Sequence, residues 1–248
     1  DSRAKNFLGH SGDLDGADII KIICDEESTA RFIARHLYHF FVADEVPVPS
    51  WNEIGPRDVE AVEELVQTYF DSNHDLSSML KTLFNSGFFR SDRSRYKKVK
   101  GPAEFAVGVL KISKEFDIPN RDMIPKYRQI GWMGQELNNP PSVEGWHEGQ
   151  EWINTGALIE RINFASEQLG NKQNPGIKEL ISDIETCISN EDDPEQTLDT
   201  CLIYMGSLKL SEDSRSAILN YAESILDTHE RVTGVIRLLG STKEFQMA

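Results

Sequence analysis

The segment around Trp146 and Trp152 carries acidic residues and a histidine, the side-chain types that move protons or hold divalent cations. If the chain is an enzyme, this loop predicts acid–base or metal chemistry, with Arg35 or Lys100 as further participants. The alternative is a Gly- and Trp-rich loop wedged between helices with its charges in water, and we favour that structural interpretation. The candidate catalytic residues are three glutamates and the histidine: Glu104, Glu144, His147 and Glu148.

A dense run of basic residues lies between positions 90 and 100 of an otherwise acidic chain. Such a run could bind a phosphate, a carboxylate or an acidic partner surface. Alternatively, these side chains pair with the protein's own carboxylates, and we favour this because Lys100 and Glu104 flank the same helix start. The candidate binding residues are these cations and the two tryptophans of the loop above: Arg90, Arg93, Arg95, Lys97, Lys98, Lys100, Trp146 and Trp152.

The segment Ser11–Gly16 partly matches a calcium-binding loop. It places oxygen-bearing side chains at alternate positions before a glycine, with Asp13, Asp15 and Asp18 as candidate ligands. The twelfth position is Ile22, where such a loop needs a bidentate glutamate. We therefore expect Asp15 or Asp18 to cap a helix instead.

His36 and His39 have a spacing that can place two imidazoles on one metal ion. No third ligand is evident, and both residues flank an apolar stripe. Hydrogen-bonded histidines at the edge of the core are the favoured interpretation. The sequence therefore predicts neither a metal ion nor a cofactor.

Composition limits the possible partners. The 26 Lys and Arg residues against 41 Asp and Glu residues give a formal net charge of −15. Phosphate backbones and anionic lipids repel such a molecule, so we do not expect nucleic acid as a partner. The apolar stretches are far shorter than the ~20 residues of a membrane-spanning helix. The three cysteines are odd in number and far apart, and they do not indicate a disulfide framework.

Apolar residues recur at helical intervals along most of the chain, which predicts an all-α fold. The clearest stripe runs from Ala30 to Val42, and Pro47 ends it. Asp15 or Asp18 marks the start of an earlier helix. Further helices are predicted at 57–70, 76–84, 102–116, 122–137, 158–169, 176–189, 195–205, 211–226 and 231–239.

The expected architecture is a multi-helix globular bundle with one long ordered Gly/Trp/Pro loop at 143–152. No alternating segment is long enough to predict a strand. We expect one helical domain over residues 1–248, with a weak sub-boundary at the acidic break 190–193.

Five segments, in order along the whole chain, share their patterns with one family: Phe7–Ile19, Thr29–Val42, Lys100–Phe105, Gly134–Trp146 and Thr242–Gln246. They include a Pro-Pro-x-Val-x-Gly-Trp loop and a closing Glu-Phe-Gln. Together they resemble the bacterial family called domain of unknown function 1800.

This resemblance implies several properties. Family members usually have a further helical portion first, so the chain is expected to be the C-terminal part of a longer protein. They often look exported, which implies a periplasmic or secreted location, although this chain shows no signal peptide. Their genes commonly neighbour those of the family called domain of unknown function 1501, which makes such a protein the expected partner. His147 and Glu148 depart from the family's pattern, which argues against catalysis by His147.

We therefore expect a non-catalytic interaction or assembly module of an exported bacterial protein. One alternative is a hydrolase or metal-dependent enzyme that uses the loop Glu144–Trp152. Another is a protein that binds an anion or an acidic partner through the basic segment Arg90–Lys100.

Overall fold

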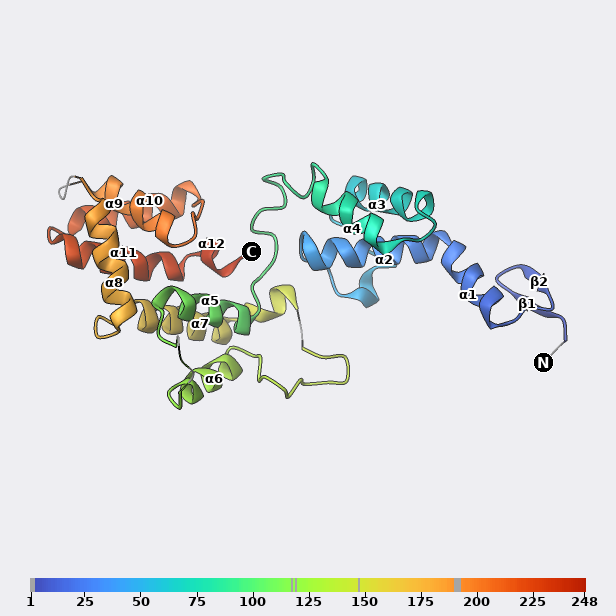
Figure 1. The fold of residues 1–248 in the computed structure, drawn as a ribbon, viewed down its shortest axis with the longest axis horizontal. Helices are drawn as coiled ribbons and strands as arrows, with labels where there is room; N and C mark the ends of the chain where they lie inside the picture. The colour runs from blue at the N-terminus through green and yellow to red at the C-terminus, as the bar shows by residue number, and fades with distance from the viewer. Residues whose placement is uncertain (1–2, 117, 119, 147, 190–192) are drawn as a thin grey trace. The chain divides into compact units, whose positions relative to one another are not determined.

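The computed structural model describes residues 3–116, 118, 120–146, 148–189 and 193–248. Helices dominate, and a single two-stranded sheet is present among these residues, so the predicted all-α fold is confirmed apart from that sheet. The chain divides into two compact units, Asp1–Lys97 and Lys98–Ala248, which run from blue to green and from green to red in Figure 1. Two compact units can still unfold together, so the single-domain expectation stays a prediction.

The expected sub-boundary at 190–193 falls mostly on residues 190–192, which lie outside the described residues. The Asp193 side chain caps the next helix, accepting hydrogen bonds from the amides of Glu195 and Gln196 at 3.0 and 3.1 Å. The helices on either side of this break belong to the same compact unit and pack against each other.

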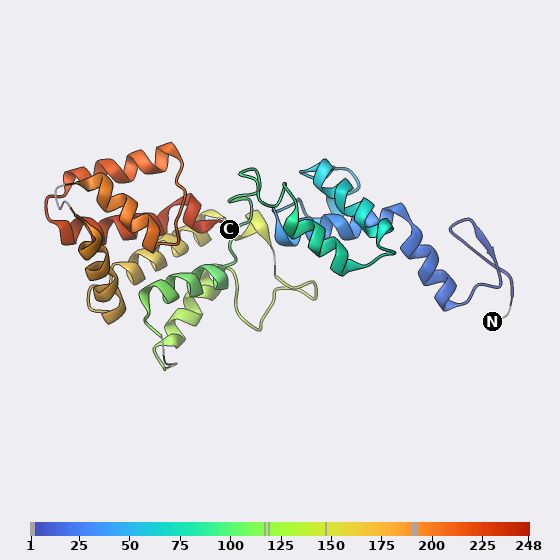
Figure 2. The same ribbon diagram turned by 45° about the horizontal axis from the view of Figure 1, so that its top comes forward.

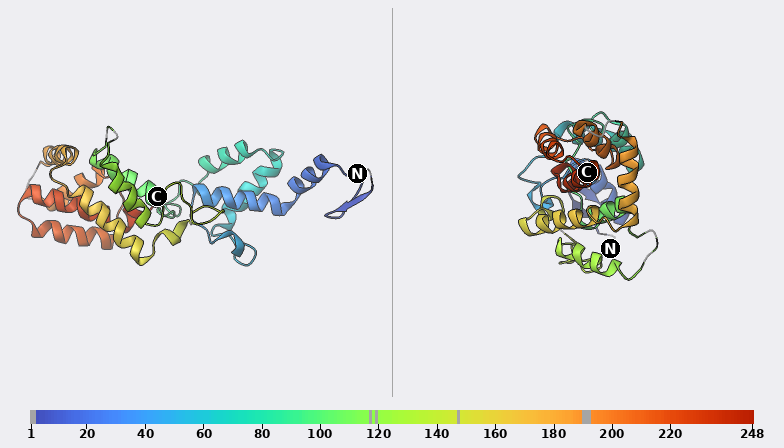
Figure 3. Two further views of the ribbon diagram at one scale, coloured as in Figure 1. Left: turned by 90° about the horizontal axis from the view of Figure 1, so that it is seen from below. Right: turned by 90° about the vertical axis from the view of Figure 1, so that its left-hand side faces the viewer.

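The first unit begins with a hairpin, which Figure 3 shows just before the first helix. Strands β1 (Lys5–Phe7) and β2 (His10–Gly12) are antiparallel, with Phe7 opposite His10. Leu8 and Gly9 both have positive φ, 46° and 84°, which suits a two-residue hairpin turn. The sequence pattern predicts no strand here, because three-residue strands are too short to show an alternating pattern.

The helices of the first unit are α1 (Gly16–Asp25), α2 (Glu27–Phe41), η1 (Val48–Ser50), α3 (Val59–Asp71) and α4 (Leu76–Asn85). Helices α2, α3 and α4 pack around an apolar cluster that includes the fully buried Ala34, Leu65 and Leu83. The hydroxyl of Tyr69, on α3, donates a hydrogen bond to the carbonyl of Cys24 at 3.0 Å and so ties the end of α1 to this cluster.

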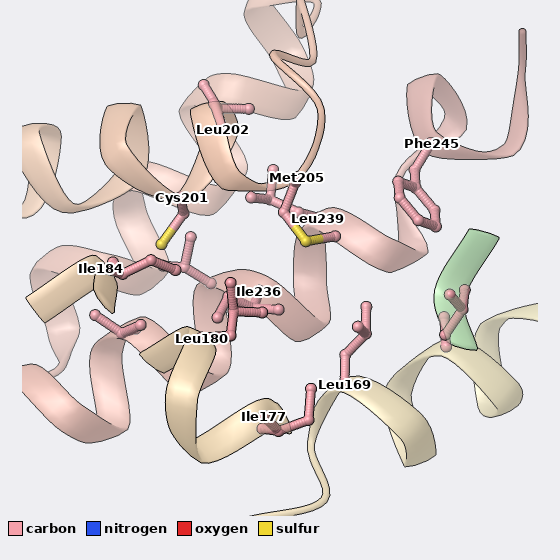
Figure 4. Close-up of a cluster of buried hydrophobic side chains, with 14 of the residues drawn as sticks. Leu169, Ile177, Leu180, Ile184, Cys201, Leu202, Met205, Ile236, Leu239 and Phe245 are labelled. Atoms are coloured by element: carbon pink, nitrogen blue, oxygen red, sulfur yellow. The ribbon is translucent and has the colours of Figure 1, made fainter. Parts of the chain in front are cut away.

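The helices of the second unit are α5 (Pro102–Ser113), α6 (Met123–Trp132), η2 (Gly149–Trp152), α7 (Thr155–Leu169), α8 (Pro175–Cys187), α9 (Pro194–Tyr204), α10 (Glu212–Ser224), α11 (Thr228–Ser241) and α12 (Lys243–Gln246). Helix α11 contacts α7, α8, α9 and α10, which surround it in Figure 2. Figure 4 shows Ile236 and Leu239 of α11 directed at apolar side chains from these neighbours. This core positions the candidate site described below.

Two glycines allow α11 to approach its neighbours closely. A Cβ atom at Gly240 would lie 2.5 Å from Cδ1 of Leu169 on α7. A Cβ atom at Gly234 would collide with the ring and hydroxyl of Tyr221 on α10. A side chain at either position would force the neighbouring side chain to move.

Two predicted helices are shorter than expected. Helix α5 ends at Ser113 because Lys114 adopts a left-handed conformation, with φ of 51°. Helix α6 ends at Trp132, and Gly134 has φ of 107°, which turns the chain away from the helix. The segment after α6 is therefore a long connection without α-helix, in agreement with the predicted Gly/Trp/Pro loop. It begins after Trp132, earlier than the predicted start at residue 143.

Candidate functional site

The end of the chain pairs with the segment that precedes α5. The amide of Lys100 donates to the carbonyl of Gln246 at 3.1 Å, and the amide of Ala248 donates to the carbonyl of Lys98 at 2.7 Å. This antiparallel contact is possible because Thr242 starts the short helix α12, where its hydroxyl oxygen accepts a hydrogen bond from the amide of Phe245. The start of α5 and the last turn of the chain thus lie side by side.

Arg161 lies where these two segments meet. It belongs to α7 and its side chain is fully buried. Its Nε donates to Oε1 of Gln246 at 2.7 Å, and its Nη2 donates to the carbonyl of Lys100 at 2.9 Å. The guanidinium carbon also lies 4.6 Å from the ring centroid of Phe105, a cation–π contact. Gln246 is itself held, since its Nε2 donates to the carbonyl of Gly240 at 3.2 Å.

The electrostatics of this cluster are unusual, because its hydrogen-bond acceptors are neutral. Buried charges are normally paired with an opposite charge, but within the described part of the chain the guanidinium of Arg161 binds only carbonyl and amide oxygens. Its Nη1 is buried and has no hydrogen-bond partner among the described residues. Burial lowers the pKa of Arg161 to about 10, and the charge of Glu104 opposes this shift.

Lys100 adds a second cation. Its ammonium group donates to the carbonyl of Phe245 at 3.0 Å and lies 5.0 Å from the centroid of that ring. Burial lowers the pKa of Lys100, the charge of Glu104 opposes this effect, and the charge of Arg161 adds to it. Glu104 itself is exposed in the first turn of α5. We call Lys100, Glu104, Phe105, Arg161, Phe245 and Gln246 the Arg161 cluster.

The connection after α6 is attached next to this cluster. The side-chain oxygen of Gln135 accepts a hydrogen bond from the amide of Ala103, in the first turn of α5, at 2.9 Å. Trp152 is buried, and its ring lies 3.6 Å from the position that a Cβ atom of Gly134 would occupy. Trp146 is half-buried, and its indole N–H has no acceptor among the described residues. Gln135 therefore attaches this connection to α5, and the ring of Trp152 packs against its start at Gly134.

The glutamates of this loop are not grouped as metal ligands in the described part of the chain. Glu144 and Glu148 are exposed, and His147 lies outside the described residues. Among the described residues, no group of three or more His, Cys, Asp or Glu side chains could hold a metal ion. Catalytic roles for Glu104, Glu144 and Glu148 stay predictions.

The basic segment is divided between the two units. Arg90, Arg93, Arg95 and Lys97 are exposed in the first unit, whereas Lys98 and Lys100 belong to the second. Arg90 donates to the side chain of Asn85 at 3.3 Å, and Arg95 lies 3.5 Å from Asp92. Of the six cations, Lys100 is the one that lies in the Arg161 cluster.

Arg35 forms a buried ion pair with Glu45 at 2.7 Å. The guanidinium also donates to the carbonyls of Ile54 and Gly55, at 2.8 and 3.0 Å, and lies 4.5 Å from the centroid of Trp51. These contacts fix the connection between α2 and α3, so Arg35 has a structural role.

The two histidines of α2 take part in the same region. The Nδ1 of His39 accepts a hydrogen bond from the amide of Glu45 at 2.9 Å. The ring of His36 packs against those of Phe32 and Trp51, with centroid distances of 4.4 and 4.6 Å.

The aspartates proposed as calcium ligands are arranged around the start of α1. The Asp15 carboxylate accepts hydrogen bonds from the amides of Ala17 and Asp18, and the Asp18 carboxylate accepts one from the amide of Asp15. This capping box confirms the capping role predicted for these residues. The amides of Asp18 and Ala17 lower the pKa of Asp15. Asp13 is exposed and lies 3.8 Å from Lys5.

Sequence reasoning missed Arg161, the centre of the cluster. A signal was present, since Arg161 follows Ala157 by four residues and precedes Phe164 and Ala165 by three and four, all on the buried face of α7. A charged residue inside an apolar helical stripe indicates either a buried polar contact or a site. Gln246 gave no such signal, because its role depends on pairing over 85 residues.

Comparisons with known proteins agree with the pattern of segments. No curated protein and no solved structure matches the chain significantly. One family model matches residues 1–247, and its description is "Protein of unknown function (DUF1800)". Three of the five segments that carry the resemblance, those at Lys100–Phe105, Gly134–Trp146 and Thr242–Gln246, meet at the start of α5. The chain belongs to the DUF1800 family.

Proposed function

We propose that this chain is a non-catalytic interaction module that assembles with a protein partner in an exported bacterial complex. The observation that carries this proposal is the orientation of α6. Of its ten residues only Ile130 is buried, while Ile124 and Trp132 are 52% and 65% exposed. Met123 and Tyr127 are exposed as well. A helix normally packs large apolar side chains against a core. The exposed apolar side chains of α6 therefore indicate a surface that binds a partner.

Helix α6 is held in place by polar contacts to α7 and to the connection that follows it. Lys126 and Gln129 reach Glu167 of α7, at 3.3 and 3.2 Å. The hydroxyl of Tyr127 donates to the carbonyl of Leu137 at 3.0 Å. Helix α6 packs against α5 and α7, on the lower side of the second unit in Figure 1. A rigid helix that displays large apolar side chains pays little conformational entropy on binding.

The chemistry of α6 indicates the kind of partner. Arg121 and Arg128 are exposed beside the apolar side chains, in a protein with a net charge of −15. A complementary partner has an apolar groove with an acidic rim. We propose that this partner belongs to the family called domain of unknown function 1501 and that the complex lies outside the cytoplasm. Among the described residues, no helix is both long and apolar enough to cross a bilayer.

Co-expression with a protein of that family, encoded by a gene next to that of this chain, tests the proposal. We expect a complex that survives size-exclusion chromatography and a dissociation constant that rises at least about tenfold, about 1.4 kcal/mol, when Ile124→Ser is combined with Trp132→Ala. The matched control is Leu226→Ser, because Leu226 is 91% exposed elsewhere in the second unit. Circular dichroism should show that all variants keep their helical content. Equal binding by the double variant and the control, or no complex with the wild-type chain, would contradict the proposal.

A further inference from the structure

We infer that Lys100 and Arg161 form a binding site for the carboxylate group of a small molecule. This inference does not depend on the surface of α6. It starts from a charge imbalance, since two cations are partly or fully removed from water and neither forms an ion pair with a carboxylate of the described chain. Hydrogen bonds to carbonyl oxygens leave the charge of a buried cation only partly compensated, whereas an anion compensates it fully.

The unused donors of the two side chains match the acceptors of a carboxylate. The Nη1 of Arg161 carries two N–H groups and has no acceptor among the described residues. The ammonium of Lys100 carries three N–H groups, of which one donates to the carbonyl of Phe245. A carboxylate has two oxygens and accepts charge-assisted hydrogen bonds from both kinds of donor.

The charge of the site selects a monoanion. Lys100 and Arg161 supply two positive charges, and Glu104 supplies one negative charge close enough to shift both of their pKa values. The local sum is therefore one positive charge, which a monocarboxylate neutralises. A phosphate dianion would bring a second negative charge into the field of Glu104 and is disfavoured.

The site lies at the first turn of α5, where the helix dipole also favours a negative charge. Lys100 is half-buried and Glu104 is exposed, whereas Arg161 is fully buried. Lys100 is therefore the cation nearer to solvent, and the guanidinium lies deeper. A small molecule fits this approach better than a side chain of a folded partner, because the backbone of such a partner must stay outside.

The experiment measures thermal unfolding and ¹³C-acetate line broadening while sodium acetate replaces sodium chloride at constant ionic strength. We expect a saturable rise of the unfolding midpoint and a saturable broadening for the wild-type chain. Lys100→Met should weaken acetate binding at least about tenfold, the size of one lost charge-assisted hydrogen bond. The matched control is Lys243→Met, since Lys243 is exposed on α12 and its removal changes the net charge equally.

Several outcomes would overturn the inference. One is an equal acetate response by wild type and Lys100→Met, and another is the absence of any response in the wild-type chain. An equal or larger effect of inorganic phosphate at pH 8 would overturn the assignment to a monoanion. A stronger response to an amide-blocked glutamate peptide than to acetate would overturn the assignment to a small molecule. Arg161→Gln adds a second check, because if this variant folds it should also lose the acetate response.

Discussion

Replacing Glu45 by alanine should destabilise the first unit by about 3–5 kcal/mol, the cost of leaving a buried charge without its partner. The side chains of Arg35 and Glu45 are 6% and 2% exposed, so water cannot take the place of the missing carboxylate. The amide of Arg57 also loses its acceptor, which lies 2.8 Å away in the intact protein. The loss concerns the connection that Arg35 ties to α2 through the carbonyls of Ile54 and Gly55.

Urea titrations followed by far-UV circular dichroism measure this free energy of unfolding. The matched control is Glu27→Ala, because Glu27 also pairs with an arginine, Arg31, but is 67% exposed. That variant should lose only about 0–1 kcal/mol. Combining Arg35→Met with Glu45→Leu should recover part of the loss, since it removes both charges. If Glu45→Ala and Glu27→Ala cost the same, Arg35 is not structural and becomes available again as a functional residue.

Three further changes test packing, pH dependence and capping. Gly234→Ala should lower the free energy of unfolding in urea titrations by about 1–3 kcal/mol, because the added methyl group collides with Tyr221. The control Gly108→Ala has open space around it and should be neutral or stabilising. Equal effects of the two changes would refute the close approach of α10 and α11. Burial alone would raise the pKa of Glu244, but hydrogen bonds from the start of α10 lower this pKa overall. The ionised Glu244 side chain therefore stabilises the fold above the ordinary pKa of glutamate, and this stabilisation is lost as the pH falls through the lowered pKa. Glu244→Gln should therefore flatten the decline of stability with acid below about pH 4, and an unchanged decline would contradict this role. Asp15→Ala should destabilise α1 by about 1 kcal/mol and Asp15→Asn by much less, as measured by amide hydrogen exchange in α1. If the carboxylates act only as caps, calcium should stabilise neither the variants nor the wild type.

Much of the fold followed from local patterns. The apolar stripe of α2 and the capping signal at the start of α1 predict the helices found there because they act within one or two turns. The ends of α5 and α6 were misplaced because they depend on left-handed conformations at Lys114 and Gly134 that composition does not reveal. The hairpin was missed because the strands have three residues each.

The site was harder to predict than the fold. Lys100 and Glu104 were selected for their charge and place at a helix start, and they do lie in the Arg161 cluster. Arg35 was selected for its charge too, but in the structure it pairs with Glu45 and holds the connection between α2 and α3 in place. Charge alone does not separate these cases, because what distinguishes them is whether an opposite charge is packed beside the cation. For Arg161 that depends on residues brought together by the tertiary fold.

The pairing of Lys98–Lys100 with Gln246–Ala248 also determines how the second unit responds to tension. Both ends of this unit leave the antiparallel contact at the same side, where Lys98 is opposite Ala248. A force that pulls the two ends apart therefore breaks these hydrogen bonds one after another, starting at Lys98 and Ala248. The two segments separate before the force acts on the helical core. Peeling that reaches Lys100 and Gln246 removes the two acceptors of Arg161, so mechanical strain on the unit and access to this buried charge are coupled.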